Sequence, residues 1–443
     1  MMQQLQRALS ASLARTIISS ISTALMLSST LAPITSEAAP DPKKVLRIAF
    51  ESADSGLDMV RSQNSIYSSW VGDTIFETLM TYDYLARPVK LVPQLAKEMP
   101  QISADGKEYT FHIRQGVMFS PDPLFKGKPR EVTAADVIYS IKRVVDPLNR
   151  SPQSSSWESK VVGLDELIAA ARKGKPFDYD KKIAGLEEVD RYTLKLRLTQ
   201  NIPTILHLLA NSTTGAVARE VVEAYGDKII AHPVGSGPYM LESYVPRSKI
   251  ILVANPNYRG FVWDFKSDDP KDAPLIASMK GKQMPQISRV EISIVEEEQS
   301  RWLAFEAGQF DFDNLSKSMA PKVLDGDKLK PKFASQGMVL DTHIAPEFTE
   351  TIMNMRDPII GGNSLEKQAL RRAIAMGYLL SDEISLLRYN QALPAQEVVT
   401  PGMAACHLII LAEILYRGKS RNIWPEREHL FVPGEVNTVI WKI

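Results

Sequence analysis

The residue types that most often carry out enzyme chemistry are few and scattered in this chain. Ser236 lies between Gly235 and Gly237. A nucleophile elbow needs Gly-x-Ser-x-Gly, yet Val234 and Pro238 occupy the outer glycine positions. No Walker loop is present, and the six histidines show no metal-ligand spacing: His112, His207, His232, His343, His407 and His429. We therefore expect no catalytic residue, no metal and no cofactor, and we do not expect an enzyme.

Two acidic clusters are better explained by structure than by a cation site. Glu296, Glu297 and Glu298 are consecutive, so on a helix their carboxylates diverge around the axis and favour the macrodipole at its amino end. Asp311 and Asp313 alternate with phenylalanines, which places both carboxylates on one side of a strand. The first cluster predicts a solvated helical turn, and the second predicts a strand that carries both carboxylates on one side.

The segment around Ser236 predicts a turn that could act as a hinge. Gly235 and Gly237 permit backbone angles and close approaches that a Cβ forbids, and Pro238 stiffens the exit from the turn. An apolar strand from 249 to 254 follows. We expect the two glycines to form the hinge.

Helical and strand patterns alternate along the rest of the chain, which indicates a mixed α/β protein. Thr133 and Asp136 predict a capping box at the start of a helix that runs to residue 145. The remaining expected strands cover 45–50, 109–114, 192–198 and 289–294, and the remaining expected helices cover 67–80, 296–306 and 365–378.

Length and composition indicate a soluble globular protein of two or three domains. The chain has 443 residues, of which 44% are hydrophobic and 23% charged. Its 52 basic and 52 acidic residues balance, so no net field favours nucleic acid or an anionic membrane.

Residues 1–38 have the pattern of a secretory signal peptide. Arg7 and Arg15 precede an apolar run over 17–34, and Ser36-Glu37-Ala38 supplies the small residues of a cleavage site after Ala38 or Ala39. The alternative is a membrane anchor, but serines and threonines interrupt the run. No cysteine for lipid attachment stands near the site, and the single cysteine, Cys406, cannot form an internal disulfide. We expect a soluble periplasmic protein with no stable membrane insertion.

Several short motifs occur together in a consistent order. They are Leu57-Asp58, residues 75–79 (IFETL), 105–114 (DGKEYTFHIR), 132–137 (VTAADV), 233–239 (PVGSGPY), 255–258 (NPNY), 308–311 (GQFD) and 370–374 (LRRAI). In this order the set resembles the family 5 extracellular solute-binding proteins, the oligopeptide-binding type that serves ABC importers, from about Val45 to about Met403.

The resemblance implies an α/β, two-lobed periplasmic-binding-protein fold of type II, incomplete at the C-terminus. It implies a first lobe of residues 41–76 and 199–285, an inserted subdomain of residues 77–198, and a partial second lobe of residues 286–403. Residues 404–443 carry none of the family's pattern. We interpret them as an atypical tail from a frameshift or truncation that does not pack like the family's closing segment. The alternative is a genuine terminal domain.

The resemblance also implies where a ligand binds. Ser52, Ala53 and Asp54, in the loop after the first strand, would form one wall of the cleft, although Asp54 could simply be a turn residue. Trp157 would present an aromatic ring to the ligand or plug a domain interface. Asn354 and Met355 would lie on a strand at the cleft edge of the second lobe. The acidic residue that anchors a peptide's amino group in this family has no counterpart here.

The function implied is that of the periplasmic binding component of an ABC importer. Such a monomer would bind a peptide or similar small solute by closure of its lobes and deliver it to the permease subunits in the membrane. The ligand stays open among di- or oligopeptides, metal chelates, haem and opines. The alternatives are an inactive gene product and a secreted hydrolase, and the missing catalytic triad stands against the latter.

Overall fold

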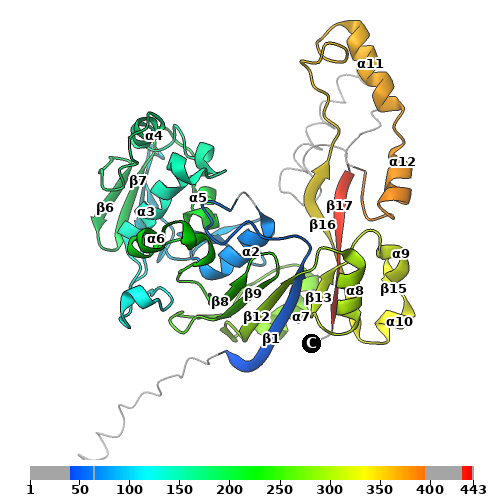
Figure 1. The fold of residues 1–443 in the computed structure, drawn as a ribbon, viewed down its shortest axis with the longest axis horizontal. Helices are drawn as coiled ribbons and strands as arrows, with labels where there is room; N and C mark the ends of the chain where they lie inside the picture. Colours follow the sequence, from blue (N-terminus) through cyan, green and yellow to red (C-terminus); the bar gives the residue numbers. More distant parts are fainter. Residues whose placement is uncertain (1–39, 63–64, 395–431, 442–443) are drawn as a thin grey trace, which may run out of the picture. The chain divides into compact units, whose positions relative to one another are not determined.

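A seven-stranded mixed sheet organises the fold of this protein. The computed structural model describes residues 40–62, 65–394 and 432–441. The strand order is β16-β17-β13-β1-β12-β9-β8 (Figure 1). Strand β1 runs parallel to β12 and β13, and the other pairs are antiparallel. The strands are β1 (Asp41–Phe50), β8 (Tyr239–Val245), β9 (Lys249–Ala254), β12 (Ile287–Ile294), β13 (Phe312–Asn314), β16 (Met338–Thr349) and β17 (Val432–Trp441).

Alternating apolar side chains fix the central strands of this sheet. Ile48 and Phe50 of β1, Ile250 of β9 and Ile292 of β12 are buried in one cluster with the inner face of helix α2 (Ile66–Ile75). A period of two places every second residue on the covered face, so the pairing register follows from this pattern. The strands predicted over 45–50, 249–254 and 289–294 are confirmed. Helix α2 is shorter than predicted because Phe76 is extended and the chain then enters β2.

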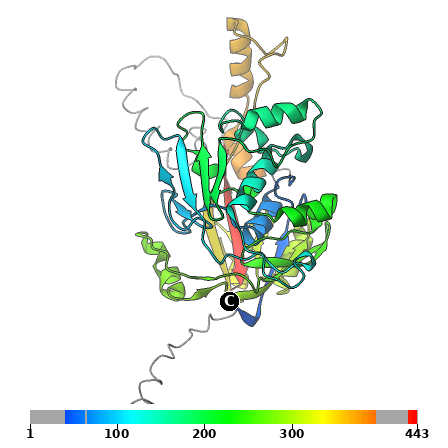
Figure 2. The ribbon, with the colours of Figure 1, turned by 90° about the vertical axis from the view of Figure 1, so that its left-hand side faces the viewer.

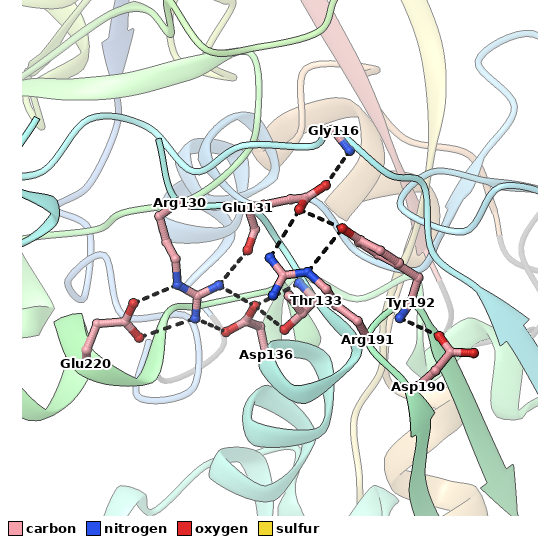
Figure 3. A network of polar contacts seen from close by, with 9 residues as sticks. All are labelled: Gly116, Arg130, Glu131, Thr133, Asp136, Asp190, Arg191, Tyr192 and Glu220. Carbon is pink, nitrogen blue, oxygen red and sulfur yellow. Dashed lines mark hydrogen bonds and ion pairs between the residues drawn. The ribbon is translucent and has the colours of Figure 1, made fainter. Parts of the chain in front are cut away.

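A second, four-stranded antiparallel sheet packs against helix α3 (Ala134–Val145). Its order is β4 (Gln101–Ile102), β5 (Glu108–His112), β7 (Thr193–Arg197) and β6 (Leu186–Asp190), and Figure 2 shows these strands in cyan to green. Helix α3 begins as predicted: the carboxylate of Asp136 accepts a hydrogen bond from Thr133 N at 2.8 Å (Figure 3). Helix α4 (Leu164–Arg172) adds its apolar face to the same core.

The remaining elements are short. The two-stranded pairs are β2 (Met80–Tyr82) with β3 (Leu91–Pro93), β10 (Phe261–Val262) with β11 (Gln283–Met284), and β14 (Leu324–Asp325) with β15 (Lys328–Leu329). The helices are α5 (Ile205–Leu208), α6 (Arg219–Tyr225), α7 (Ala273–Met279), α8 (Glu298–Glu306), α9 (Ala320–Val323), α10 (Pro331–Ala334), α11 (Leu365–Met376) and α12 (Leu380–Asp382). The 3₁₀ turns cover Pro123–Phe125, Pro147–Asn149, Ser154–Ser156, Ser212–Thr214, Gly226–Ala231 and Pro270–Asp272, and a π turn covers Glu383–Leu387.

Strand pairing and hydrophobic packing extend across the predicted domain boundaries. Strand β12 pairs with β1 on one side and β9 on the other, so one sheet joins residues on both sides of the boundary expected at 285/286. We call the core under the four-stranded sheet the first core. It extends past residue 198, since Ile205, Leu209 and Val221 pack with that sheet. A third core, which includes Trp302, Phe305 and Phe333, lies under α8, α9 and α10. The boundaries at 198/199 and 285/286 stay predictions.

The last described residues of the chain join the large sheet. Residues 432–441 form strand β17, which is inserted between β13 and β16 and pairs antiparallel with both. Alternation of β-branched residues such as Val436, Thr438 and Ile440 suits this segment to a strand. Whether residues 404–443 pack as the family's closing segment does stays a prediction.

Three predictions fall outside the described residues. They concern the signal peptide over 1–38, its cleavage site, and Cys406. Within the ranges that the structure describes, no helix is both long and apolar enough to cross a membrane.

Candidate functional site

Three parallel strands end together at one edge of the large sheet, which we call the β1 edge. Strand β1 ends at Phe50 and β12 at Ile294, and Val295 N donates to Phe50 O at 2.9 Å. Ile294 N donates to Ser248 O, also at 2.9 Å, which ties the β8–β9 turn to the same edge. Ligands of open α/β sheets bind beyond the carboxyl ends of the strands. Residues 52–54, which the resemblance predicts to contact a ligand, follow β1 directly and so lie at this edge.

Asp54 is held by hydrogen bonds but keeps one oxygen free among the described residues. Its Oδ1 accepts from Tyr244 OH at 2.6 Å and from Gly56 N at 2.8 Å. Its Oδ2 is buried without a partner in that part of the chain. Burial and the neighbouring Asp54 raise the pKa of Tyr244, so the phenol stays protonated and keeps donating. Asp54 is thus a turn residue that also retains an acceptor for a further donor.

Three aromatic side chains gather beside this loop. The ring centroid of Phe50 lies 4.6 Å from that of Tyr67 and 5.9 Å from that of Trp70. Tyr67 and Trp70 are one turn apart on α2, and their rings meet edge to face at 5.5 Å. Trp70 is 41% exposed. The sequence predicted a helix over 67–80 without singling out Trp70 as a site residue; an i, i+3 aromatic pair on the helix after β1 is the signal that would have found it.

A buried ion pair between Arg301 and Asp313 lies behind this loop. Arg301 is 1% exposed; its Nε lies 3.0 Å from Asp313 Oδ1, and its Nη1 donates to Val295 O at 3.0 Å. Burial raises the pKa of Asp313 to about 6, and Arg301 opposes that rise. The same guanidinium is 3.8 Å from Glu51 Oε2, whose side chain is 37% exposed. Glu51 therefore puts a partly paired carboxylate at the mouth of the edge, and the sequence interpretation missed it.

The acidic residues Glu297 and Asp311, which the sequence analysis singled out, make hydrogen bonds to the backbone. Glu297 caps helix α8, accepting hydrogen bonds from Gln299 N at 3.0 Å and Ser300 N at 2.6 Å. Asp311 Oδ2 accepts from Arg47 N at 2.5 Å and so fastens the start of β13 to β1. No group of three or more metal-ligating side chains occurs among the residues with described positions.

The two predicted hinge glycines are required by close packing. A Cβ on Gly235 would lie 2.0 Å from Ile75 O, and one on Gly237 would lie 2.5 Å from Thr74 O. Neither glycine has a positive φ, so the expectation of backbone angles reserved for glycine is wrong. Between them, Ser236 Oγ donates to Glu77 Oε2 at 3.0 Å. The segment is thus clamped to the end of α2.

The other predicted ligand-binding residues are not among the residues that form the β1 edge. Trp157 is 1% exposed inside the first core, so its ring offers no surface to a ligand in this structure. Asn354 lies outside any strand, because β16 ends at Thr349, and its side chain accepts from Arg356 N at 3.0 Å in a turn. Met355, in the same turn, is 47% exposed. The expected strand at 354–355 is therefore wrong.

Comparison with known proteins identifies the family. The model of the bacterial extracellular solute-binding proteins, family 5 Middle, matches residues 90–409. The chain belongs to this family. Di/tripeptide-binding protein 4 of Pseudomonas aeruginosa (strain UCBPP-PA14) is 27% identical over 226 residues, which are 48% of this chain and 38% of that protein. The periplasmic oligopeptide-binding protein OppA of Salmonella typhimurium is 29% identical over 197 residues, 44% and 32% of the two chains.

Solved structures of family 5 relatives show the same fold. The periplasmic binding protein DppA from Helicobacter pylori, in complex with the peptide STSA, aligns with a TM-score of 0.60 and 21% identity. The alignment covers 87% of this chain and 64% of DppA. The chain therefore has the predicted mixed α/β, type II periplasmic-binding-protein fold. It spans about a third to two fifths of the length of the curated relatives that it matches.

Proposed function

We propose that this chain is the solute-binding component of an ABC importer, and that it binds peptides in the periplasm and delivers them to membrane permease subunits. The observation that carries the proposal is the family 5 match over residues 90–409. Relatives named as di/tripeptide-binding and oligopeptide-binding proteins favour a peptide over a metal chelate, haem or opine. A role in binding without catalysis also suits the scattered histidines.

The β1 edge offers the chemistry that an extended peptide needs. The unpaired Oδ2 of Asp54 and the half-exposed carboxylate of Glu51 can accept hydrogen bonds from ligand N–H groups or from a terminal ammonium. Ser52 and Ala53 supply backbone groups beside them, and Trp70 provides an exposed aromatic face. We propose these residues as the ligand wall, together with the segment at Gly235 and Gly237 as the hinge. Binding shifts the lobes toward closure only as far as the closed state binds the peptide more tightly.

Tryptophan fluorescence during titration with trialanine tests the proposal. Among the tryptophans whose side chains the structure describes, Trp157, Trp263 and Trp302 are almost fully buried, so Trp70 is the one whose surroundings we expect peptide binding to change. We expect a saturable change in emission that disappears in a Trp70→Phe variant. The matched control, Trp302→Phe, removes a buried indole from the third core and should retain the signal.

Two further results separate the alternatives. An inactive product would show no saturable signal and no change in melting temperature with trialanine, whereas a binder is stabilised by ligand. A hydrolase would release alanine during the titration, which an amino-acid assay detects. Either result would contradict a peptide-binding role.

A further inference from the structure

A cavity of about 560 Å³ lies between helix α3, strand β6 and the start of helix α6, away from the β1 edge residues. Its volume is within the range of small-molecule sites. One wall is apolar and includes Ile138, Ile183 and Leu186. The other walls carry charged and phenolic side chains, among them Lys142 and Tyr179. The cavity therefore combines an apolar surface with fixed polar groups, as ligand sites do.

Lys142 brings an unusual charge to this cavity. It is 4% exposed, and its Nζ donates to the carbonyl oxygens of Tyr179 at 2.7 Å and Lys181 at 2.9 Å. No carboxylate of the described residues lies within the 4.0 Å of an ion pair with this ammonium. Burial lowers the pKa of Lys142, while Asp178 and Asp180 oppose that effect from a longer distance. An ammonium group has three N–H donors, and the two carbonyls accept from two of them. The third N–H has no acceptor in these contacts, and no close carboxylate balances the buried positive charge.

Two other cations that line the cavity, Arg130 and Arg219, are held in ion pairs. Arg130 pairs with Asp136 at 2.7 Å and with Glu220 at 2.7 Å, and Figure 3 shows its guanidinium held between these two carboxylates. Arg219 pairs with Asp180 and Glu223. Lys182 also lines the cavity, but it is exposed, so water solvates its ammonium. Lys142 is therefore the buried lining cation with no close carboxylate among the residues with described positions. The acidic residues of β6, Glu187 and Glu188, lie at the exposed rim, where solvent screens them.

We propose that this cavity binds a small organic carboxylate, separately from the peptide site. The carboxylate group forms a charge-assisted hydrogen bond with Lys142 Nζ, and its aliphatic part lies along Ile138, Ile183 and Leu186. The buried charge explains why a carboxylate should bind better than a cation. A carboxylate balances the positive charge of the desolvated Lys142 ammonium, whereas an alkylammonium of the same length adds a second positive charge beside it.

Calorimetric titration of the full chain with hexanoate, hexan-1-ol and hexylammonium tests the site. We expect saturable hexanoate binding, at least about tenfold tighter than that of either six-carbon control. Lys142→Met keeps the length of the side chain and removes the charge, so hexanoate affinity should fall by about tenfold or more. Trp70→Phe at the β1 edge should leave hexanoate binding unchanged, which separates this cavity from the proposed peptide site.

Ile138→Trp provides a second test that leaves Lys142 and its hydrogen bonds in place. Ile138 is half-buried, so a larger ring can fill the cavity from its open side. We expect hexanoate binding to be lost while trialanine binding persists. If Lys142→Met does not fold, Ile138→Trp decides the matter. Equal affinity for hexanoate and hexylammonium, unchanged hexanoate binding in Ile138→Trp, or no saturable binding to the wild type would each overturn the proposal.

Discussion

Replacing Gly235 with alanine should destabilise the protein through a clash with the end of helix α2. The added Cβ would lie 2.0 Å from Ile75 O, where ordinary contact begins at 3.4 Å, so the two backbones must separate by up to 1.4 Å. Overpacking of this kind costs about 1–3 kcal/mol. The shift also strains two hydrogen bonds of 2.8 Å, Ser120 N to Gly235 O and Gly237 N to Ile75 O, each worth about 1 kcal/mol.

These costs exceed the benefit that alanine brings. Replacing glycine reduces the entropy of the unfolded chain and stabilises by about 0.4–1 kcal/mol where the backbone conformation is compatible. The expected net loss is therefore about 3 kcal/mol, a large part of a typical unfolding free energy of about 5–15 kcal/mol. Urea unfolding followed by circular dichroism measures it, provided that the transition is two-state.

Two further glycine variants make the reasoning refutable. Gly237→Ala brings its Cβ to 2.5 Å from Thr74 O, a smaller overlap, and should lose less stability, about 2 kcal/mol. Gly377→Ala is the matched control, because this residue has φ −77° and its nearest neighbours lie 3.5 and 3.6 Å from the added Cβ. We expect it to be neutral or slightly stabilising. Equal unfolding free energies for the Gly235 and Gly377 variants would refute the close-approach argument.

Two other predictions concern buried polar groups. The pKa of Asp313 is raised to about 6 from its ordinary 3.8, so the native state binds an extra proton between these values and stability falls as pH rises through them. Relative to Asp313→Asn, the wild type should lose about 3 kcal/mol between about pH 3 and pH 7, and a constant difference across this range in urea unfolding would contradict it. Thr133→Ala removes the hydrogen bond that Thr133 Oγ1 donates to Asp136 Oδ2 at 2.8 Å and should cost about 1 kcal/mol in the same assay; Thr213→Ala, which removes a hydrogen bond to Asn211 Oδ1 in a surface turn, is the control.

Local patterns in the sequence were sufficient for several of the elements and for the family. The alternation over 289–294 and the capping box of Thr133 and Asp136 depend on neighbours within a few residues, so they could be predicted without tertiary information. The acidic residues before α8 likewise act within one helical turn. The motif order identified family 5, and the match over residues 90–409 confirms it.

Only the tertiary structure decided which residues share the candidate site and why the hinge needs glycine. Glu51, Trp70 and Arg301 meet because β1, α2 and α8 converge at one sheet edge, and no local spacing encodes that meeting. Trp157 was predicted at a ligand but lies in a core formed by distant segments. The glycine requirement at residue 235 depends on the carbonyl of Ile75, far away in sequence. Local periodicity determines which elements form, whereas burial and contact depend on the elements that pack beside them, and those arise from the whole chain.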